Sequence, residues 1–369
     1  MKIQILQENF YQALNNASRF ASTRAQLPVL GNILLKATKN KLFVLSTNLE
    51  ISLATSIGAQ VKEAGEITVP ARAITEIVAN LAPGTISVTS EKEQLKIESQ
   101  GSKLTVLGMN TADFPSVPEK LDQKNSFSLP KNLFQEAISQ VIFASSIDET
   151  RPVLTGVLAI FKKGSLTLVA TDGFRLSQKK IEIKGPEKAF QMILPKNVLL
   201  EIAKFSDNEE EGVLLSYKET EHQISFGFVD TVLSSRLLEG EFPDFEKIIP
   251  KESNTKVNVD KDELLRVVKL ASVFARDSAN IVKIETKKDS IIISAESSQA
   301  GNQKTELEAR VEGKELEIAF NYRFLEDFLH SLKGESVDIR FSSANAPGVF
   351  TDPQDTTLIH LIMPVRIQS

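Results

Sequence analysis

Residues 31–52 read GNILLKATKNKLFVLSTNLEIS, residues 156–177 read GVLAIFKKGSLTLVATDGFRLS, and residues 279–299 read ANIVKIETKKDSIIISAESSQ. Each segment begins with an apolar strand, passes a lysine-rich polar step and enters a second apolar strand, which is the pattern of a β-hairpin. The polar steps run from Thr38 to Lys41, from Lys162 to Ser165 and from Lys287 to Ser290. Because the hairpin recurs at intervals of about 125 residues, the sequence predicts a repeated architecture.

Short amphipathic segments flank these hairpins and predict helices. One of them carries apolar residues at helical spacing, namely Leu133, Phe134, Ala137, Ile138 and Val141. The six expected helices begin near Gln7, Ala71, Lys131, Lys196, Lys261 and Tyr322, at steps of 64, 60, 65, 65 and 61 residues. Four follow an apolar strand that ends in Pro or Asn (ITVP, FSLP, MILP and IAFN), and proline suits the start of a helix because its missing N–H would be unpaired there.

Two proline-bearing connectors mark the expected domain boundaries. They are DFPSVP at residues 113–118 and EFPDFEKIIP at residues 241–250, and proline ends strands and stiffens linkers. We therefore expect an α+β protein with three similar domains at residues 1–124, 125–251 and 252–369. Each domain would hold two copies of a half-unit that consists of a strand, a helix and further strands.

Such a repeat can place its helices on one side and its antiparallel sheets on the other. If two chains join head to tail, the array can close into a ring whose sheets lie outside and whose helices line a central hole. Duplex DNA is uniformly charged along its length, so such a hole could hold it without reading bases. This is a hypothesis about geometry.

Composition limits the chemistry that the chain can perform. It has no Cys, which excludes disulfides and thiol catalysis, and its net charge is −5. The three His residues, His222, His330 and His360, lie far apart, and we expect surface or strand-end imidazoles. The sequence thus predicts no metal, no cofactor and no catalytic residue. The charge also argues against a conventional basic DNA-binding module.

Two other classes of function remain open from the residues alone. An enzyme would have to use the carboxylates of Asp172, Asp244 or Glu246, which lie in expected turns without His partners. A structural repeat scaffold or adhesin would share the repeat but would more often be secreted. The alternating N-terminus and the lack of a long apolar run predict neither export nor a membrane span, so we expect a cytoplasmic protein.

Four motifs carry a family resemblance. They are Leu27-Pro28-Val29-Leu30-Gly31-Asn32 after Arg24, Ala170-Thr171-Asp172-Gly173-Phe174-Arg175-Leu176, Phe242-Pro243-Asp244, and Met363-Pro364-Val365-Arg366. In this order and spacing they resemble the bacterial sliding clamps, the beta subunits of DNA polymerase III, from residue 1 to residue 369. The resemblance implies a non-catalytic, head-to-tail homodimeric ring that encircles double-stranded DNA and tethers the polymerase, loaded by a separate ATP-driven partner. The chain agrees in lacking a GxxxxGK[ST] loop.

By this resemblance Arg24 and Arg72 face DNA, and the repeat extends the expectation to Lys131, Lys196 and Arg323 at later helix starts. The alternative for each is an ordinary solvated side chain. At Asp148, Pro152 and Val153 the sequence lacks the polar or aromatic groups often found at DNA positions of the family.

The resemblance also implies an apolar groove that receives short linear peptides of polymerases, the loader and repair proteins. Its expected residues are Leu154, Thr171, Gly173, Phe174, Arg175, Leu176, Pro243, Lys247, Ile248, Met363, Pro364, Val365 and Arg366. Leu, Ile, Met and Pro would form apolar walls, while Arg and Lys at the rim could meet acidic or carbonyl groups of the ligand. Phe174 stands where the family commonly has His, and Lys247 where it has Arg. Residues Gln368 and Ser369 extend past the usual terminus.

A simpler reading of Asp172-Gly173 is a hairpin turn, in which Gly accepts positive φ and Asp caps its own backbone. Thr47-Asn48 is the equivalent step of the first repeat. For the joint between two chains, the resemblance implies Leu104, Val106, Val273 and Phe274. The alternative for these four is that they fill the cores of their own domains.

Overall fold

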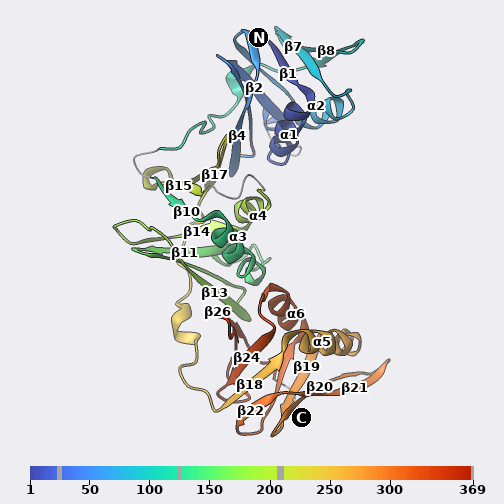
Figure 1. The fold of residues 1–369 in the computed structure, drawn as a ribbon, viewed down its shortest axis with the longest axis vertical. Coiled ribbons are helices and arrows are strands. Elements are labelled where there is room, and N and C mark those ends of the chain that lie inside the picture. Colours follow the sequence, from blue (N-terminus) through green and yellow to red (C-terminus); the bar gives the residue numbers. More distant parts are fainter. Residues whose placement is uncertain (23–26, 123–125, 206–211, 367–369) are drawn as a thin grey trace. The chain divides into compact units, whose positions relative to one another are not determined.

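The computed structural model describes residues 1–22, 27–122, 126–205 and 212–366 (Figure 1). The chain divides into two compact units. The N-terminal unit comprises residues 1–131 and 206–237, and the C-terminal unit comprises residues 132–205 and 238–369. This division crosses the expected middle domain, whose first boundary lies outside the described residues. The three-domain division stays a prediction.

Six α-helices lie in the described part of the chain, and each begins at the residue near which the sequence predicts a helix start. They are α1 (Gln7–Ser18), α2 (Ala71–Ala79), α3 (Lys131–Ser139), α4 (Lys196–Lys204), α5 (Lys261–Ala275) and α6 (Tyr322–Ser331). Helix α1 buries Phe10, Leu14 and Ala17 along one stripe, as an amphipathic helix does. The α5 start is capped by Asp260, whose carboxylate accepts the Glu263 N–H at 2.8 Å.

The N-terminal unit contains two antiparallel sheets. The first has the order β5-β1-β7-β8-β9, with β1 (Lys2–Leu6), β5 (Gln60–Glu63), β7 (Thr85–Glu91), β8 (Gln94–Ser99) and β9 (Ser102–Leu107). The second has the order β10-β15-β16-β17-β4-β3-β2-β6, with β2 (Asn32–Thr38), β3 (Lys41–Thr47), β4 (Ile51–Gly58), β6 (Gly65–Pro70), β10 (Ser126–Leu129), β15 (Val213–Lys218), β16 (Gln223–Gly227) and β17 (Thr231–Arg236).

The C-terminal unit also contains two antiparallel sheets. One has the order β14-β11-β12-β13-β26-β25-β24-β18-β22, with β11 (Gly156–Lys162), β12 (Ser165–Thr171), β13 (Arg175–Glu182), β14 (Phe190–Pro195), β18 (Thr255–Asp260), β22 (Arg310–Gly313), β24 (Ser336–Phe341), β25 (Gly348–Asp352) and β26 (Asp355–Ile362). The other has the order β21-β20-β19-β23, with β19 (Ile281–Thr286), β20 (Ser290–Ser297), β21 (Gly301–Glu308) and β23 (Glu317–Asn321). The three predicted hairpins, β2–β3, β11–β12 and β19–β20, are confirmed.

Each long sheet joins strands from two different thirds of the sequence: the first and the middle third in the N-terminal unit, and the middle and the last third in the C-terminal unit. In the N-terminal unit β4 pairs with β17, and in the C-terminal unit β13 pairs with β26. Because of these two ladders, the middle third of the sequence is divided between the two compact units. The α+β class with antiparallel sheets is confirmed.

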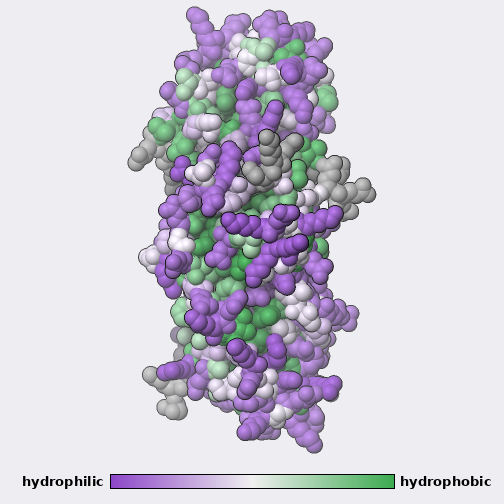
Figure 2. Space-filling model, turned by 90° about the vertical axis from the view of Figure 1, so that its left-hand side faces the viewer, coloured by the Kyte–Doolittle hydropathy of each residue, from purple (hydrophilic) through white to green (hydrophobic). Residues whose placement is uncertain are grey.

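Aromatic packing fills the core of the C-terminal unit. Phe350 meets the rings of Phe320 and Phe328 edge to face at 5.7 and 5.9 Å between centroids, a favourable geometry for aromatic pairs. On the surface, the face in Figure 2 is covered mostly by hydrophilic side chains, with apolar ones between them. Within the described residues, every helix is too short or too polar to cross a membrane.

Candidate functional site

The turn between β12 and β13 is held by its own side chains. The Thr171 hydroxyl donates to the Arg175 carbonyl at 2.7 Å and accepts the Gly173 N–H at 3.1 Å. The Asp172 carboxylate accepts the N–H groups of Phe174 and Arg175 at 2.9 and 3.0 Å. Gly173 adopts φ +91°, so the predicted tight turn, with glycine at positive φ and aspartate as the cap, is confirmed.

The C-terminal strand lies beside this turn. In the ladder between β13 and β26, Arg175 is opposite Ile362. One residue further on, the Met363 N–H donates to the Phe174 carbonyl at 2.8 Å, and the Val365 N–H then donates to Ala319 on β23 at the same distance. The turn and the tail, nearly 190 residues apart in the sequence, therefore form one continuous backbone structure.

Arg175 connects the turn to helix α6. Its guanidinium donates to Asp172 at 3.1 Å, to Asp327 at 2.6 Å and to the Phe143 carbonyl at 2.6 Å. It also lies 4.5 Å above the ring of Phe324, within the range of a cation–π contact. The side chain is only 10% exposed. The expectation of a rim cation is therefore wrong for Arg175, because its donors are used within the chain.

The connector after residue 238 packs against the same region. Phe245 is buried in a cluster with Leu176 and Leu361, and Phe242 lies at its margin. Pro243, Lys247 and Ile248 are exposed on this connector, and Lys247 forms an ion pair with Asp244 at 2.7 Å, which raises the pKa of the lysine. The connector therefore brings these three predicted residues to the apolar cluster beneath the turn.

Three large apolar side chains remain exposed here, namely Phe174 (63%), Ile248 (46%) and Met363 (39%). We call this region, defined by the turn 171–176, the connector residues 243–248 and the tail 363–366, the turn–tail surface. Pro364 and Val365 are half-buried and Arg366 is exposed, whereas Leu154 and Leu176 are buried. Leu176 belongs to the apolar cluster of Phe245 and Leu361.

A buried histidine lies behind the turn–tail surface. His360 on β26 stacks on Phe328 at 4.8 Å between ring centroids, with Phe143 at 5.4 Å. Neither ring nitrogen has a hydrogen-bond partner among the described residues. Burial, and secondarily the charge of Arg175, hold the pKa of His360 well below its usual value. The expectation of a surface or strand-end imidazole is wrong here, since the ring is fully buried.

The cations predicted at helix starts differ in exposure. Arg72 and Arg323 are exposed at the second residue of α2 and α6, and Arg72 donates to Glu76 at 2.9 Å. Lys196 is half-buried at the start of α4, where burial and the nearby Arg175 lower its pKa. Lys131 is only 6% exposed, so it is poorly available for phosphate. Arg24 lies outside the described residues.

Each unit also has a sheet edge with apolar residues beside it. In the N-terminal unit, β9 is an edge strand; Leu104 lines a hollow of about 530 Å³ with Ile77 and Leu81, and Val106 is buried. In the C-terminal unit, β21 is an edge strand, and helix α5 exposes 52% of Val273 while Phe274 packs partly into the core. Val106 therefore fills the core of its own unit, as the alternative interpretation expected, whereas Val273 does not.

Three family models cover nearly the whole chain in order. The N-terminal domain of the DNA polymerase III beta subunit matches residues 1–118, the central domain matches residues 128–244, and the C-terminal domain matches residues 246–366. The chain belongs to the beta sliding clamp family.

Named relatives of this clamp agree in sequence and in structure. The beta sliding clamp of Bacillus subtilis is 30% identical over 379 residues, which span 99% of this chain and 100% of the relative. That of Staphylococcus aureus is 28% identical over 99% of both chains. The crystal structure of the B. subtilis clamp matches with a TM-score of 0.95 at 29% identity over 100% of both chains, and a Pseudomonas aeruginosa beta subunit matches with a TM-score of 0.93 at 26% identity, covering 99% of this chain and 100% of that one.

Sequence reasoning missed several exposed apolar residues of this clamp. Leu107 at the end of β9 is 69% exposed, and Leu270 on α5 is 45% exposed one turn before Val273. The i, i+3 spacing of Leu270 and Val273 on the polar side of a helix was a usable signal.

Asp148, where the family often has a DNA-contacting group, is hydrogen-bonded within its own loop. Its carboxylate accepts the N–H and the hydroxyl of Thr150 at 3.0 and 2.7 Å, and these bonds lower the pKa of the carboxyl.

Proposed function

We propose that this clamp joins a second copy head to tail, closes around duplex DNA without reading its sequence, and holds polymerase, loader and repair proteins through short linear segments at the turn–tail surface. In this proposal the sheets lie outside and the helices line the hole. The chain catalyses no reaction, binds no cofactor or metal, and works in the cytoplasm. The proposal rests most on the likeness of the whole chain to solved sliding clamps.

The free sheet edges support self-association. Strand β9 ends one sheet of the N-terminal unit and β21 ends one sheet of the C-terminal unit. Exposed edge strands present unpaired N–H and C=O groups, which a second chain can satisfy. Because the two edges belong to different parts of the chain, the contact between copies would be head to tail. Leu104 and Val273 would contribute apolar contact beside the paired strands.

The charge distribution supports topological rather than adhesive DNA binding. A net charge of −5 gives little general attraction to phosphates. Arg72 and Arg323 are nevertheless exposed at helix N-termini, where backbone N–H groups also favour phosphate. We assign DNA contact to these two first and to Lys196 second, and we keep Arg24 by resemblance. The burial of Lys131 leaves it the weakest of the five.

The turn–tail surface supports peptide capture. It combines exposed Phe174, Ile248 and Met363 with two exposed cations, Lys247 and Arg366. Apolar pockets with a few polar groups suit short extended ligands. The buried Leu176 and the hydrogen-bonded Arg175 next to them would lower the ordering cost of binding.

Self-association is tested by sedimentation of Leu104→Asp and Val273→Asp variants. Either change should convert a dimer to a monomer, because a buried unpaired carboxylate is costly in an apolar joint. Leu214→Asp is the control, since Leu214 is 41% exposed on β15, which is not an edge strand. Dimers in both test variants would remove these residues from the joint.

DNA encirclement is tested by loading the protein onto nicked circular DNA with a clamp loader. Retention should survive high salt and be lost when the DNA is linearised, because a topological link does not depend on ion pairs. Loss in salt alone would indicate ordinary electrostatic binding and contradict the proposal.

Peptide capture is tested with a glutamine- and leucine-rich clamp-binding peptide. Met363→Asp should weaken binding at least about tenfold, or about 1.4 kcal/mol. Val229→Asp is the matched control, because Val229 is 62% exposed in the N-terminal unit. An equal effect of both changes, or no binding by the unmodified chain at micromolar peptide, would refute the assignment.

A further inference from the structure

A second groove lies in the N-terminal unit, at the end of the edge strand β9 that the proposed function assigns to the joint between two copies. It has a volume of about 970 Å³, and its lining includes Glu66, Ile67, Glu93, Leu107 and Met109. We call it the β6–β9 groove, since it lies between edge strand β6 of one sheet and the end of edge strand β9 of the other. Its volume reaches the upper end of the usual range of ligand pockets.

Backbone hydrogen bonds fix the shape of this groove. The Gly108 N–H donates to the Glu93 carbonyl at 2.7 Å, and the Met109 N–H donates to the Thr68 carbonyl at 3.0 Å. The Thr68 hydroxyl donates back to the Met109 carbonyl at 2.9 Å. A Cβ atom at Gly108 would lie 2.3 Å from the Thr68 carbonyl oxygen, so only glycine allows this approach. The groove is therefore preformed.

Apolar side chains are exposed in the groove. Leu107 is 69% exposed and Met109 is 44% exposed, while Ile67 on strand β6 is buried. Two neighbouring large apolar side chains at an open groove favour a ligand with apolar groups of its own. Methionine adapts its shape to different partners.

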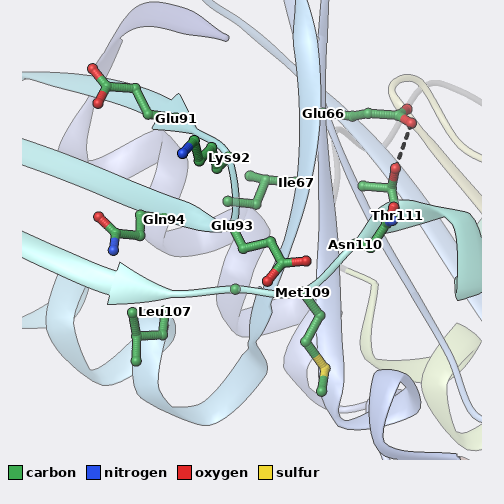
Figure 3. Close-up of a pocket in the computed structure, with 11 residues that line it drawn as sticks. Glu66, Ile67, Glu91, Lys92, Glu93, Gln94, Leu107, Met109, Asn110 and Thr111 are labelled. Atoms are coloured by element: carbon green, nitrogen blue, oxygen red, sulfur yellow. Dashed lines mark hydrogen bonds between the residues drawn. The ribbon is translucent and has the colours of Figure 1, made fainter.

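Negative charge surrounds these apolar residues. Figure 3 shows Glu66 on one side of Ile67, with Glu91 and Glu93 on the hairpin across from it. Of the residues that the structure describes, Lys92 is the one cation that lines the groove. Glu91 is engaged by Lys96 at 2.6 Å, and Glu66 accepts the Thr111 hydroxyl at 2.8 Å. Among the described residues, the Glu93 carboxylate has no ion pair. An extended ligand in this groove would therefore meet carboxylates at both walls.

We propose that the β6–β9 groove docks a basic, amphipathic peptide segment of a partner protein, in which Lys or Arg alternates with apolar residues. In an extended peptide, successive side chains point to opposite sides. Apolar residues would then contact Leu107 and Met109 while the intervening cations reach Glu66 and Glu93. This site is separate from the turn–tail surface, which belongs to the C-terminal unit. The carboxylates of the groove favour a basic ligand, whereas Lys247 and Arg366 of the turn–tail surface favour an acidic one.

The test is fluorescence anisotropy of a labelled Lys-Leu-Lys-Leu-Lys-Leu-Lys peptide with the full chain. Binding should saturate, weaken with added salt, and exceed that of the Glu-Leu counterpart at least about tenfold, because the carboxylates repel it. A Glu66→Gln/Glu93→Gln double variant should bind at least about fivefold more weakly. Met109→Ser should weaken binding without changing its salt dependence.

Two controls separate this groove from other surfaces. A Glu241→Gln/Glu252→Gln variant carries the same change of charge at exposed positions of the C-terminal unit and should bind the peptide normally. An unlabelled glutamine- and leucine-rich peptide should not displace the probe. Failure to saturate, equal loss in the control variant, displacement by that peptide, or an altered sedimentation of the Glu66/Glu93 variant would each overturn the proposal. The last outcome would mean that the groove belongs to the contact between copies.

Discussion

The turns at residues 47–51 and 171–175 use the same hydrogen bonds, yet only the second has an exposed aromatic ring and a buried arginine. In the first turn the Thr47 hydroxyl donates to the Ile51 carbonyl at 3.1 Å and accepts the Leu49 N–H at 3.0 Å. The Asn48 side chain accepts the N–H groups of Glu50 and Ile51 at 3.0 and 2.8 Å. Thr171 and Asp172 make the same four contacts.

The next backbone contact is repeated as well. The Arg236 N–H donates to the Glu50 carbonyl at 2.9 Å, just as the Met363 N–H donates to the Phe174 carbonyl. In both units, therefore, a strand from a later third of the sequence closes against the turn. The repeated backbone is a property of the fold. The candidate function depends on the side chains that differ, since Leu49, Glu50 and Ile51 stand where the second turn has Gly173, Phe174 and Arg175.

Of the substitutions at the two turns, replacement of Arg175 should change the unfolding free energy most. An Arg175→Ala change would leave two carboxylates and a carbonyl without their donor, and breaking a buried ion pair typically costs about 3 kcal/mol or more of unfolding free energy. Urea unfolding of the C-terminal unit should report this loss, and peptide binding should fall with it. Arg236→Ala is the control beside the first turn, because Arg236 is exposed and only its backbone contacts Glu50. Equal stability of the two variants would show that the Arg175 contacts contribute little.

Removing the caps of both turns should give a smaller difference. Asn48→Ala should cost about 1 kcal/mol through loss of two N–H acceptors. Asp172→Ala should cost about 2 kcal/mol because it also removes one of the two carboxylates that Arg175 contacts. Only the Asp172 change should weaken the glutamine- and leucine-rich peptide, measured by anisotropy. A loss of peptide binding in the Asn48 variant would contradict the separation of fold from site.

Substitutions at the third residue of each turn should change the unfolding free energy in opposite directions. Leu49 holds φ +76° and Gly173 holds φ +91°, a region that is costly for residues with a Cβ. Leu49→Gly should therefore stabilise the protein by about 1 kcal/mol, and Gly173→Ala should destabilise it by about 1 kcal/mol. Thermal unfolding of the two variants measures both effects. The same sign in both would mean that strain does not dominate at these turns.

The smallest effect should be a pH dependence confined to the second region. His360 lies opposite Ser177, as Leu233 lies opposite Leu53 beside the first turn. Because the pKa of His360 is lowered on folding, the unfolded chain binds the extra proton, and stability falls as pH falls below the unfolded pKa. Between pH 7 and pH 6 the loss should stay below about 1 kcal/mol.

His360→Leu gives the second region the residue found in the first and should remove this part of the pH dependence. Urea unfolding at both pH values measures the difference between the variant and the unmodified chain. An unchanged pH slope in the variant would rule out His360 as the source.

Local sequence signals predicted the repeating elements well. Helix starts such as Tyr322 follow a strand that ends in a capping Asn321, and hairpins such as β11–β12 alternate over a few residues. These signals act between neighbours in the chain, so a single sequence carries them fully.

Pairings between distant segments could not be predicted in this way. The contact between Arg175 and Asp327 spans 152 residues, and nothing local indicates which carboxylate an arginine meets. The same limit hid the ladder between β13 and β26, the burial of Lys131 and the full burial of His360. Leu154, Phe174 and Met363 were named only through resemblance, because their periodicity alone fits a core or a strand end.

Strand β26, the last strand in the described sequence, completes the nine-stranded sheet only at the end of synthesis. Its residues, Asp355–Ile362, insert between β25 and β13, so the nine-stranded sheet stays in two pieces until the ribosome has made them. Contacts of such sequence separation form late and slowly. The first turn needs only β17, which is made more than 100 residues earlier. A chain that stops short of β26 would thus fold its N-terminal unit yet lack a complete turn–tail surface, so unfinished products could not compete with finished ones for peptide partners.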